Sequence, residues 1–310
     1  MCSGRIFPPR IYKGRLENIT GGNAATGCAP DVTDAKAPIP EASAPRPWRD
    51  LGLRGASAAV LIPIAVLGIW SGGVVWDVLV GVAVVLLSWE WARFCKISIW
   101  RWPGLLMPTV SLVVMLLAAF GPPLAAIGVL AAGTLLLFLL QRQGDIWPAA
   151  GLFYIGLAGF SLVLLRGEDH AGLLNTLFMV LIVWASDTGA YVAGRALGGP
   201  KLAPAISPGK TWSGAAGGLL AATLIGAGAA ALLAPGGASR AAAIAAMLGV
   251  MSQAGDLLES AIKRRFGVKD SSSLIPGHGG MLDRLDGVMA AAPMATALAL
   301  LAGRGMPLWH

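Results

Sequence analysis

The sequence predicts an all-α integral membrane protein, a polytopic helical bundle of about nine transmembrane helices. Three observations favour this fold class: 56% of the 310 residues are hydrophobic, only 13% are charged, and 42 are glycine. Soluble domains average about 25% charged residues, whereas small residues are typical of packed transmembrane helices. Several apolar runs approach or exceed the ~18 residues that indicate a membrane span. Only helices satisfy their own backbone polar groups over such runs.

The chain divides into three predicted parts. Residues 1–50 are rich in Pro, Gly, Ala and Asn and contain no apolar stretch of the kind found in secretory signals, so we expect a disordered cytoplasmic N-terminal tail. Residues 51–145 form N-terminal transmembrane helices. Residues 146–310 form a transmembrane catalytic region with cytoplasmic loops at 194–212 and 257–284. The predicted spans lie near 57–71, 73–91, 104–120, 123–141, 147–165, 171–193, 213–234, 238–256 and 285–303.

The positions of Lys and Arg predict the orientation of these spans. With the N-terminus in the cytoplasm, most cationic loop residues fall on the inner side, and the outer side holds Arg166, Arg240 and Arg304. Because positive residues favour the cytoplasmic side, both loops 194–212 and 257–284 are expected there, where nucleotides are found. The cations border apolar spans, so the net charge of +7 indicates membrane topology and not nucleic-acid binding. No internal repeat is visible, which argues against a secondary transporter.

The segment 255–287 concentrates charge between two apolar stretches. Its acidic residues are Asp256, Glu259, Asp270, Asp283 and Asp286. Its basic residues are Lys263, Arg264, Arg265, Lys269 and Arg284, with His278 close by. Charge at a membrane boundary is costly and therefore usually functional. Carboxylates beside a basic cluster indicate metal ions that hold a polyphosphate.

The spacing of the acidic residues predicts which of them meet. Asp256, Glu259 and Ser260 share one helix face at i, i+3 and i+4. Asp283 and Asp286 are three residues apart at the start of the last span, where a helix N-terminus favours negative charge and phosphate. These two could serve only as helix caps, but four carboxylates around one loop exceed what capping needs. We therefore predict a shared Mg²⁺ site.

Several neighbouring residues have two interpretations. Glycines next to His278 let the backbone turn tightly and approach a ligand, so this histidine either assists phosphate chemistry or only fixes the loop. Arg264 and Arg265 either bind phosphate or belong to an ordinary positive-inside cluster. Glu90 precedes Arg93 by three residues, and an ion pair between them is the simple expectation.

A second polar patch runs from 187 to 214. Asp187 lies inside an apolar run with Tyr191 one turn later. An unpaired carboxylate there would be costly, so a partner or a metal is expected. Ser207, Lys210 and Thr211 offer hydroxyls and an ammonium from a rigid Pro-Gly turn. This is not a Walker A loop, because the first glycine is missing, and a plain loop is the alternative.

Together these motifs resemble a known family. The pattern similar to its signature is Ser260-x2-Lys263-Arg264-x4-Lys269-Asp270-x5-Pro276-Gly-His278-Gly-Gly-x2-Asp283-Arg284-x-Asp286. The upstream pattern is Asp187-x3-Tyr191-x2-Gly194-Arg195 with Ser207-Pro-x-Lys210-Thr211. Both resemble the phosphatidate cytidylyltransferases, over about 147–310. The sequence departs from the family at Ser213, where Glu is expected, and at Gly209, where a second basic residue is common.

The resemblance implies transfer of a cytidylyl group from CTP to phosphatidic acid, giving CDP-diacylglycerol and pyrophosphate in phospholipid biosynthesis. It implies a Mg²⁺-dependent enzyme in the bacterial inner membrane, with its active site facing the cytoplasm. A second cation, monovalent or divalent, and a homodimer are both left open. Metal ligands by similarity are Asp256, Asp283 and, as a further contributor, Asp187. The further catalytic residues are Lys263 and His278. The substrate-binding residues by similarity are Tyr191, Ser207, Lys210, Thr211, Ser260, Arg264, Lys269, Asp270, Arg284 and Asp286.

Other classes of membrane protein compete with this interpretation. A CDP-archaeol synthase-like or polyprenol kinase-like enzyme would differ in its lipid or nucleotide, which a substrate panel separates. A CDP-alcohol phosphotransferase would need an Asp-Gly-x2-Ala-Arg motif that the sequence lacks. A transporter or channel could use Asp187, Asp256 and Glu259 as cation ligands, and ion flux without pyrophosphate release would favour it.

Overall fold

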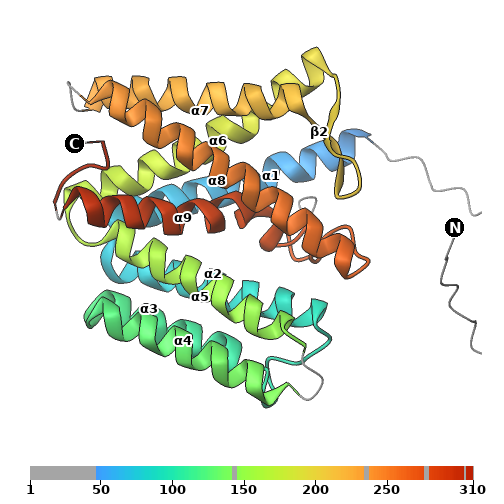
Figure 1. The fold of residues 1–310 in the computed structure, drawn as a ribbon, viewed down its shortest axis with the longest axis vertical. Helices are drawn as coiled ribbons and strands as arrows, with labels where there is room; N and C mark the ends of the chain where they lie inside the picture. Colours follow the sequence, from blue (N-terminus) through green and yellow to red (C-terminus); the bar gives the residue numbers. More distant parts are fainter. Residues whose placement is uncertain (1–46, 142–144, 234–236, 276–278, 304, 310) are drawn as a thin grey trace, which may run out of the picture. The chain divides into compact units, whose positions relative to one another are not determined.

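A computed structural model describes residues 47–141, 145–233, 237–275, 279–303 and 305–309. Within these residues the chain forms nine helices and one small β-hairpin (Figure 1). The helices are α1 (Pro47–Ser71), α2 (Gly73–Phe94), α3 (Leu106–Phe120), α4 (Pro123–Leu140), α5 (Trp147–Arg166), α6 (His170–Leu197), α7 (Trp212–Leu233), α8 (Ala238–Arg265) and α9 (Leu282–Ala302). Residues 1–46 of the predicted tail lie outside the described residues.

The predicted all-α membrane bundle is confirmed, and each predicted span has its helix. Seven of the described helices are long and apolar enough to cross a membrane: α2 and α4 to α9. The apolar stretch 59–71 of α1 and the whole of α3 are apolar but shorter. Large apolar side chains also face outward, and Leu124, Leu232 and Leu301 are each more than four-fifths exposed. Such surfaces suit contact with lipid tails better than contact with water.

Most helix boundaries lie within a few residues of the sequence prediction, and two differ by nine or ten residues. Helix α8 does not end at residue 256 but continues to Arg265, so the predicted loop 257–284 begins as helix. Helix α1 starts at Pro47, ten residues before the predicted span. Both extensions contain charged residues, which end an apolar run but not a helix, because Glu, Lys and Arg are good helix formers. The prediction located the apolar part of each helix and not its full length.

The segment 194–212 contains a hairpin that the sequence analysis treated as a turn. Strands β1 (Lys201–Ala203) and β2 (Ser207–Thr211) pair antiparallel, with Lys201 opposite Thr211 and Ala203 opposite Ser207. The strands are too short, and too rich in Pro and Gly, to show the alternation of apolar and polar residues that predicts a strand. The hairpin gives the residues of this segment a fixed register.

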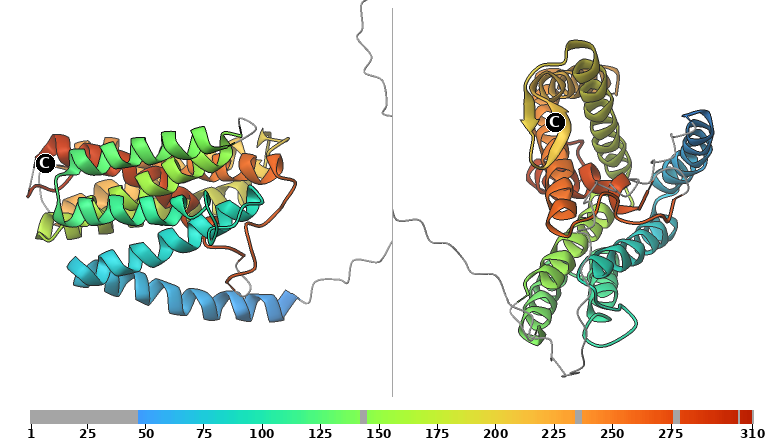
Figure 2. Two further views of the ribbon diagram at one scale, coloured as in Figure 1. Left: turned by 90° about the horizontal axis from the view of Figure 1, so that it is seen from below. Right: turned by 90° about the vertical axis from the view of Figure 1, so that its right-hand side faces the viewer.

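The core lies between helices and forms two buried clusters. One is built mainly from α2 to α5, and the other from α6 to α9 with the C-terminal residues Leu308 and Trp309. The hairpin and the segment after α8 lie at the same end of the helices, and the right-hand view of Figure 2 shows the yellow hairpin beside the orange α8. Both polar segments follow even-numbered helices, as the predicted topology requires for segments on one side of a membrane.

Candidate active site

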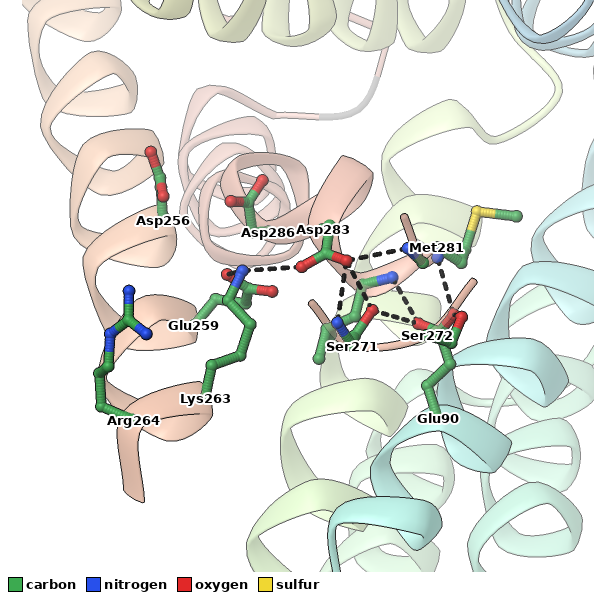
Figure 3. A network of polar contacts seen from close by, with 12 residues as sticks. Glu90, Asp256, Glu259, Lys263, Arg264, Ser271, Ser272, Met281, Asp283 and Asp286 are labelled. Atoms are coloured by element: carbon green, nitrogen blue, oxygen red, sulfur yellow. Dashed lines mark hydrogen bonds and ion pairs between the residues drawn. The ribbon is translucent and has the colours of Figure 1, made fainter. Parts of the chain in front are cut away.

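The site forms where α8 and α9 approach closely. Gly255 of α8 is buried against α9, and a Cβ at this position would lie 2.5 Å from the backbone oxygen of Asp286. Glycine therefore permits a helix contact that no other residue allows without movement. This contact brings Asp256 beside Asp286, and Glu259 lies three residues after Asp256 on the same helix face (Figure 3).

Three acidic residues, which we call the acidic triad, converge here: Asp256, Glu259 and Asp286. Each offers a carboxylate oxygen, and these three oxygens lie within 4.8 Å of one another. Glu259 is only 2% exposed, and among the described residues its Oε1 has no hydrogen-bond partner. A buried carboxylate oxygen without a donor is costly unless a cation or water satisfies it. Oxygen ligands of this kind are those that Mg²⁺ and Ca²⁺ prefer, so the triad fits a divalent cation.

Lys263 joins the triad to the start of α9. Its Nζ lies 2.6 Å from Glu259 Oε2, one helix turn earlier, and 2.7 Å from Asp283 Oδ1. The side chain of Lys263 is 15% exposed, so both ion pairs are largely shielded from water. Breaking a shielded pair from one side leaves a charge without its partner and is strongly destabilising. Lys263 is therefore held in one place beside the triad.

Asp283 uses both of its oxygens within the protein. Oδ1 accepts a hydrogen bond from Lys263, and Oδ2 accepts hydrogen bonds from the Ser271 N–H at 3.0 Å, the Ser271 hydroxyl at 2.9 Å and the Gly280 N–H at 2.8 Å. The triad forms without Asp283, although the sequence analysis placed this residue among the metal ligands. Its observed contacts make it the anchor of Lys263 and of the segment before α9.

The hairpin closes the other side of the site. Lys210 Nζ of β2 lies 2.6 Å from Asp256 Oδ2, and the Arg264 Nε–H donates to the Ile206 carbonyl at 3.1 Å. Next to this contact is a cavity of about 500 Å³ between α6, α8 and the hairpin. Residues lining it include Asp187, Tyr191, Lys210, Thr211, Gln253 and Asp256. A cavity of this size, with an ammonium and carboxylates in its wall, can hold a phosphorylated small molecule.

The structure brings most of the predicted site residues into this region. Asp187, Tyr191, Lys210, Thr211 and Asp256 line the cavity, and Lys263, Asp283 and Asp286 form the neighbouring network. Asp187 is not part of the acidic triad. Ser207 lies in β2, and Ser260 is half-buried on α8. Exposed members of the predicted set are Arg264, Lys269, Asp270 and Arg284. His278 lies outside the described residues.

The sequence analysis did not predict the contacts of two acidic residues, Glu259 and Glu90. It placed Glu259 on the correct helix face but gave it no role in the site. The structure places it in the acidic triad, and its spacing from Asp256 was the available signal. Glu90 was expected to pair with Arg93, and that expectation is wrong. The Arg93 guanidinium instead lies 4.9 Å from the centre of the Trp89 ring, and Glu90 accepts hydrogen bonds from the segment before α9. A carboxylate inside an apolar helix was the available signal, because such a group needs partners.

Comparison with known proteins shows the family of this chain. The profile of the cytidylyltransferase family matches residues 52–302. A phosphatidate cytidylyltransferase of Brucella suis is 43% identical over 257 residues, covering 79% of this chain and 92% of the relative. A protein of the same name from Pseudomonas aeruginosa is 38% identical over 285 residues, covering 81% of this chain and 97% of the relative. One from Bacillus subtilis is 36% identical over 215 residues, covering 69% and 76%. The match spans nearly all of the described helices, including those that build the acidic triad, and the chain therefore belongs to the cytidylyltransferase family.

Proposed function

We propose that this protein is a phosphatidate cytidylyltransferase that uses Mg²⁺, CTP and phosphatidic acid to form CDP-diacylglycerol and pyrophosphate. The observation that carries the proposal is the acidic triad next to Lys210 and Lys263, at one end of a bundle of membrane-spanning helices. The names of the relatives supply the substrate class. The site supplies the means to bring two phosphorylated substrates together at the edge of a membrane.

The reaction requires cancellation of a large negative charge. A phosphate oxygen of phosphatidic acid forms a new bond to the α-phosphorus of CTP, and the bond from that phosphorus to the bridging oxygen of the β-phosphate breaks. Pyrophosphate leaves with the bonding electrons. A triphosphate and a phosphomonoester repel each other, so positioned cations lower the barrier by electrostatic stabilisation.

The acidic triad is the proposed Mg²⁺ site. Asp256, Glu259 and Asp286 would hold the ion, which when bound neutralises phosphate charge and polarises the reacting phosphoryl group. The unpartnered Oε1 of Glu259 supports this assignment. Asp187 lines the cavity and would be a ligand of a second cation. Asp283 keeps Lys263 in place through the ion pair at 2.7 Å.

In this proposal the basic side chains of the site bind the substrate phosphates. Lys210 places an ammonium on the hairpin, where it pairs with Asp256, and Thr211 and Ser207 add hydroxyls from the same strand. We assign the cavity to the nucleotide, because it lies beside the triad and has polar groups from α6, β2 and α8 in its wall. The lipid phosphate would approach from the bilayer. Because positive residues favour the cytoplasmic side, we place the protein in the inner membrane of a bacterial cell with its active site facing the cytoplasm.

The test is a reconstituted assay. Protein purified in detergent or lipid nanodiscs should release pyrophosphate and form CDP-diacylglycerol when given Mg²⁺, CTP and phosphatidic acid together. Omission of any one of the three should stop the reaction. A panel of other nucleotides and of isoprenoid lipids distinguishes a related lipid enzyme, and turnover of one of those pairs in place of CTP and phosphatidic acid would reject the proposal.

A further inference from the structure

Glu90 on α2 is a buried carboxylate that holds a distant segment. Its side chain is 0% exposed. Oε1 accepts hydrogen bonds from the Ser272 hydroxyl at 2.6 Å and the Met281 N–H at 2.8 Å. Oε2 accepts hydrogen bonds from the Ser271 hydroxyl at 3.1 Å and the Leu282 N–H at 2.7 Å. Both oxygens therefore bind one segment that lies far along the chain, immediately before α9.

These contacts give α9 the cap that its own sequence does not provide. The first N–H groups of a helix have no partner within the helix, and the N-cap residue Met281 makes no side-chain capping hydrogen bond. Glu90 supplies the missing acceptor from α2, and the helix dipole favours a negative charge at this end. None of the three ion pairs found among the described residues involves Glu90. Its charge is instead stabilised by backbone N–H groups and hydroxyls.

The same contacts lead directly to the acidic triad. The Ser271 hydroxyl lies within hydrogen-bonding distance of both Glu90 and Asp283. Asp283 holds Lys263, and Lys263 holds Glu259 (Figure 3). Gly280 packs directly against Ser271 and Glu90, since a Cβ there would lie 1.9 Å from Ser271 Oγ and 2.5 Å from Glu90 Oε1. The packing therefore leaves no room for a side chain at position 280.

We propose that Glu90 is a positioning residue for this enzyme: it clamps residues 271–275 and 279–282 against the start of α9 and thereby fixes Asp283 and Lys263 beside the acidic triad. The inference rests on the proposed cytidylyl transfer, because that reaction is what the positioned groups serve. Glu90 acts through Ser271 and Asp283 and is not itself a member of the triad.

The main test replaces Glu90 by Gln, which has the same shape but has only one acceptor oxygen and no charge. We expect kcat to fall about 10- to 100-fold, the range seen when partners that orient metal-site residues are removed. The Mg²⁺ concentration for half-maximal activity should rise, and Glu90→Asp should recover part of the loss because it keeps the charge. Hydrogen–deuterium exchange should become faster in the peptide spanning 279–285.

Glu168→Gln is the matched control, since Glu168 is exposed in the short connection between α5 and α6.

A second variant covers the case in which Glu90→Gln folds poorly. Ser272→Ala removes one donor to Glu90, together with the acceptor of the Leu274 N–H, and leaves the three contacts of Ser271. It should therefore shift exchange and the Mg²⁺ requirement in the same direction by a smaller amount. Wild-type exchange and a wild-type Mg²⁺ requirement in the folded fraction of either variant would overturn the inference. A wild-type protein that released no pyrophosphate would instead overturn the proposed function, while the exchange measurement would still report on the clamp.

Discussion

Lys210 and Asp256 form an ion pair of 2.6 Å that links the hairpin to α8 at the entrance of the acidic triad. The lysine side chain is 26% exposed and the aspartate 37%. In this arrangement a lysine neutralises a carboxylate that we propose as a metal ligand. Metal and nucleotide would take over the carboxylate and the ammonium respectively. On this proposal, the pair holds both groups next to the acidic triad.

Replacing Lys210 by Ala should reduce kcat/KM for CTP about 10- to 100-fold. A hydrogen bond to a charged group contributes roughly 1.5–3 kcal/mol, and each 1.4 kcal/mol corresponds to about tenfold in rate. Steady-state pyrophosphate release at varied CTP measures the change. Lys201→Ala is the control on the neighbouring strand, where the side chain is exposed. An equal loss in that control would point to the overall charge of the hairpin and against the ion pair.

Replacing Glu259 by Gln should raise the Mg²⁺ requirement and lower maximal turnover. The variant keeps the shape of the side chain but removes one charge from the triad, whose oxygens lie within 4.8 Å of one another. Chelation of the wild-type protein with EDTA should stop turnover, and added Mg²⁺ should restore it. The readouts are activity and direct Mn²⁺ binding by electron paramagnetic resonance. Unchanged metal binding in Glu259→Gln, Asp256→Asn and Asp286→Asn alike would remove the triad as the metal site.

Replacing Asp283 by Asn should strongly reduce pyrophosphate release to a low but measurable level. The protein should remain folded, as judged by thermal unfolding in detergent, because Glu259 still pairs with Lys263. The variant weakens the ion pair to Lys263 and places an amide where three donors converge. A double-mutant cycle with Lys263→Ala tells how Asp283 acts. If Asp283 works through Lys263, the double variant should be about as impaired as either single variant. Fully additive losses would favour the direct metal-ligand role predicted from the sequence, and near-normal turnover of Asp283→Asn would contradict both roles.

Replacing Gly280 by Ala should reduce both stability and activity. A Cβ at this position meets Ser271 and Glu90 at distances that force the segment to move, and overpacking of this kind costs about 1–3 kcal/mol. Gly228→Ala in α7 is the matched control, because a Cβ there has nothing within 4 Å and alanine favours a helix. Melting temperature and turnover are measured together. A Gly280→Ala protein that matches the control in both would show that the clamp tolerates displacement.

Local patterns in the sequence were sufficient to predict the helices and the two segments in which acidic and basic residues gather. Long apolar runs give helices in a membrane because backbone polar groups must be paired there. The i, i+3 spacing of Asp256 and Glu259 places them on one face in any helix. What local patterns missed were contacts between distant segments. The hairpin depends on pairing of two short strands, and the partner of Glu90 lies at least 181 residues away.

The sequence by itself determined that this protein is a helical membrane protein with acids and bases gathered in two segments, because composition and periodicity are local properties. Only the tertiary structure decided that Glu259, and not Asp283, completes the triad with Asp256 and Asp286. It also decided that Asp283 and Glu90 hold the segment before α9. The physical reason is that the close approach of α8 and α9 at Gly255 and the capping of α9 from α2 depend on packing between helices, which no local pattern encodes.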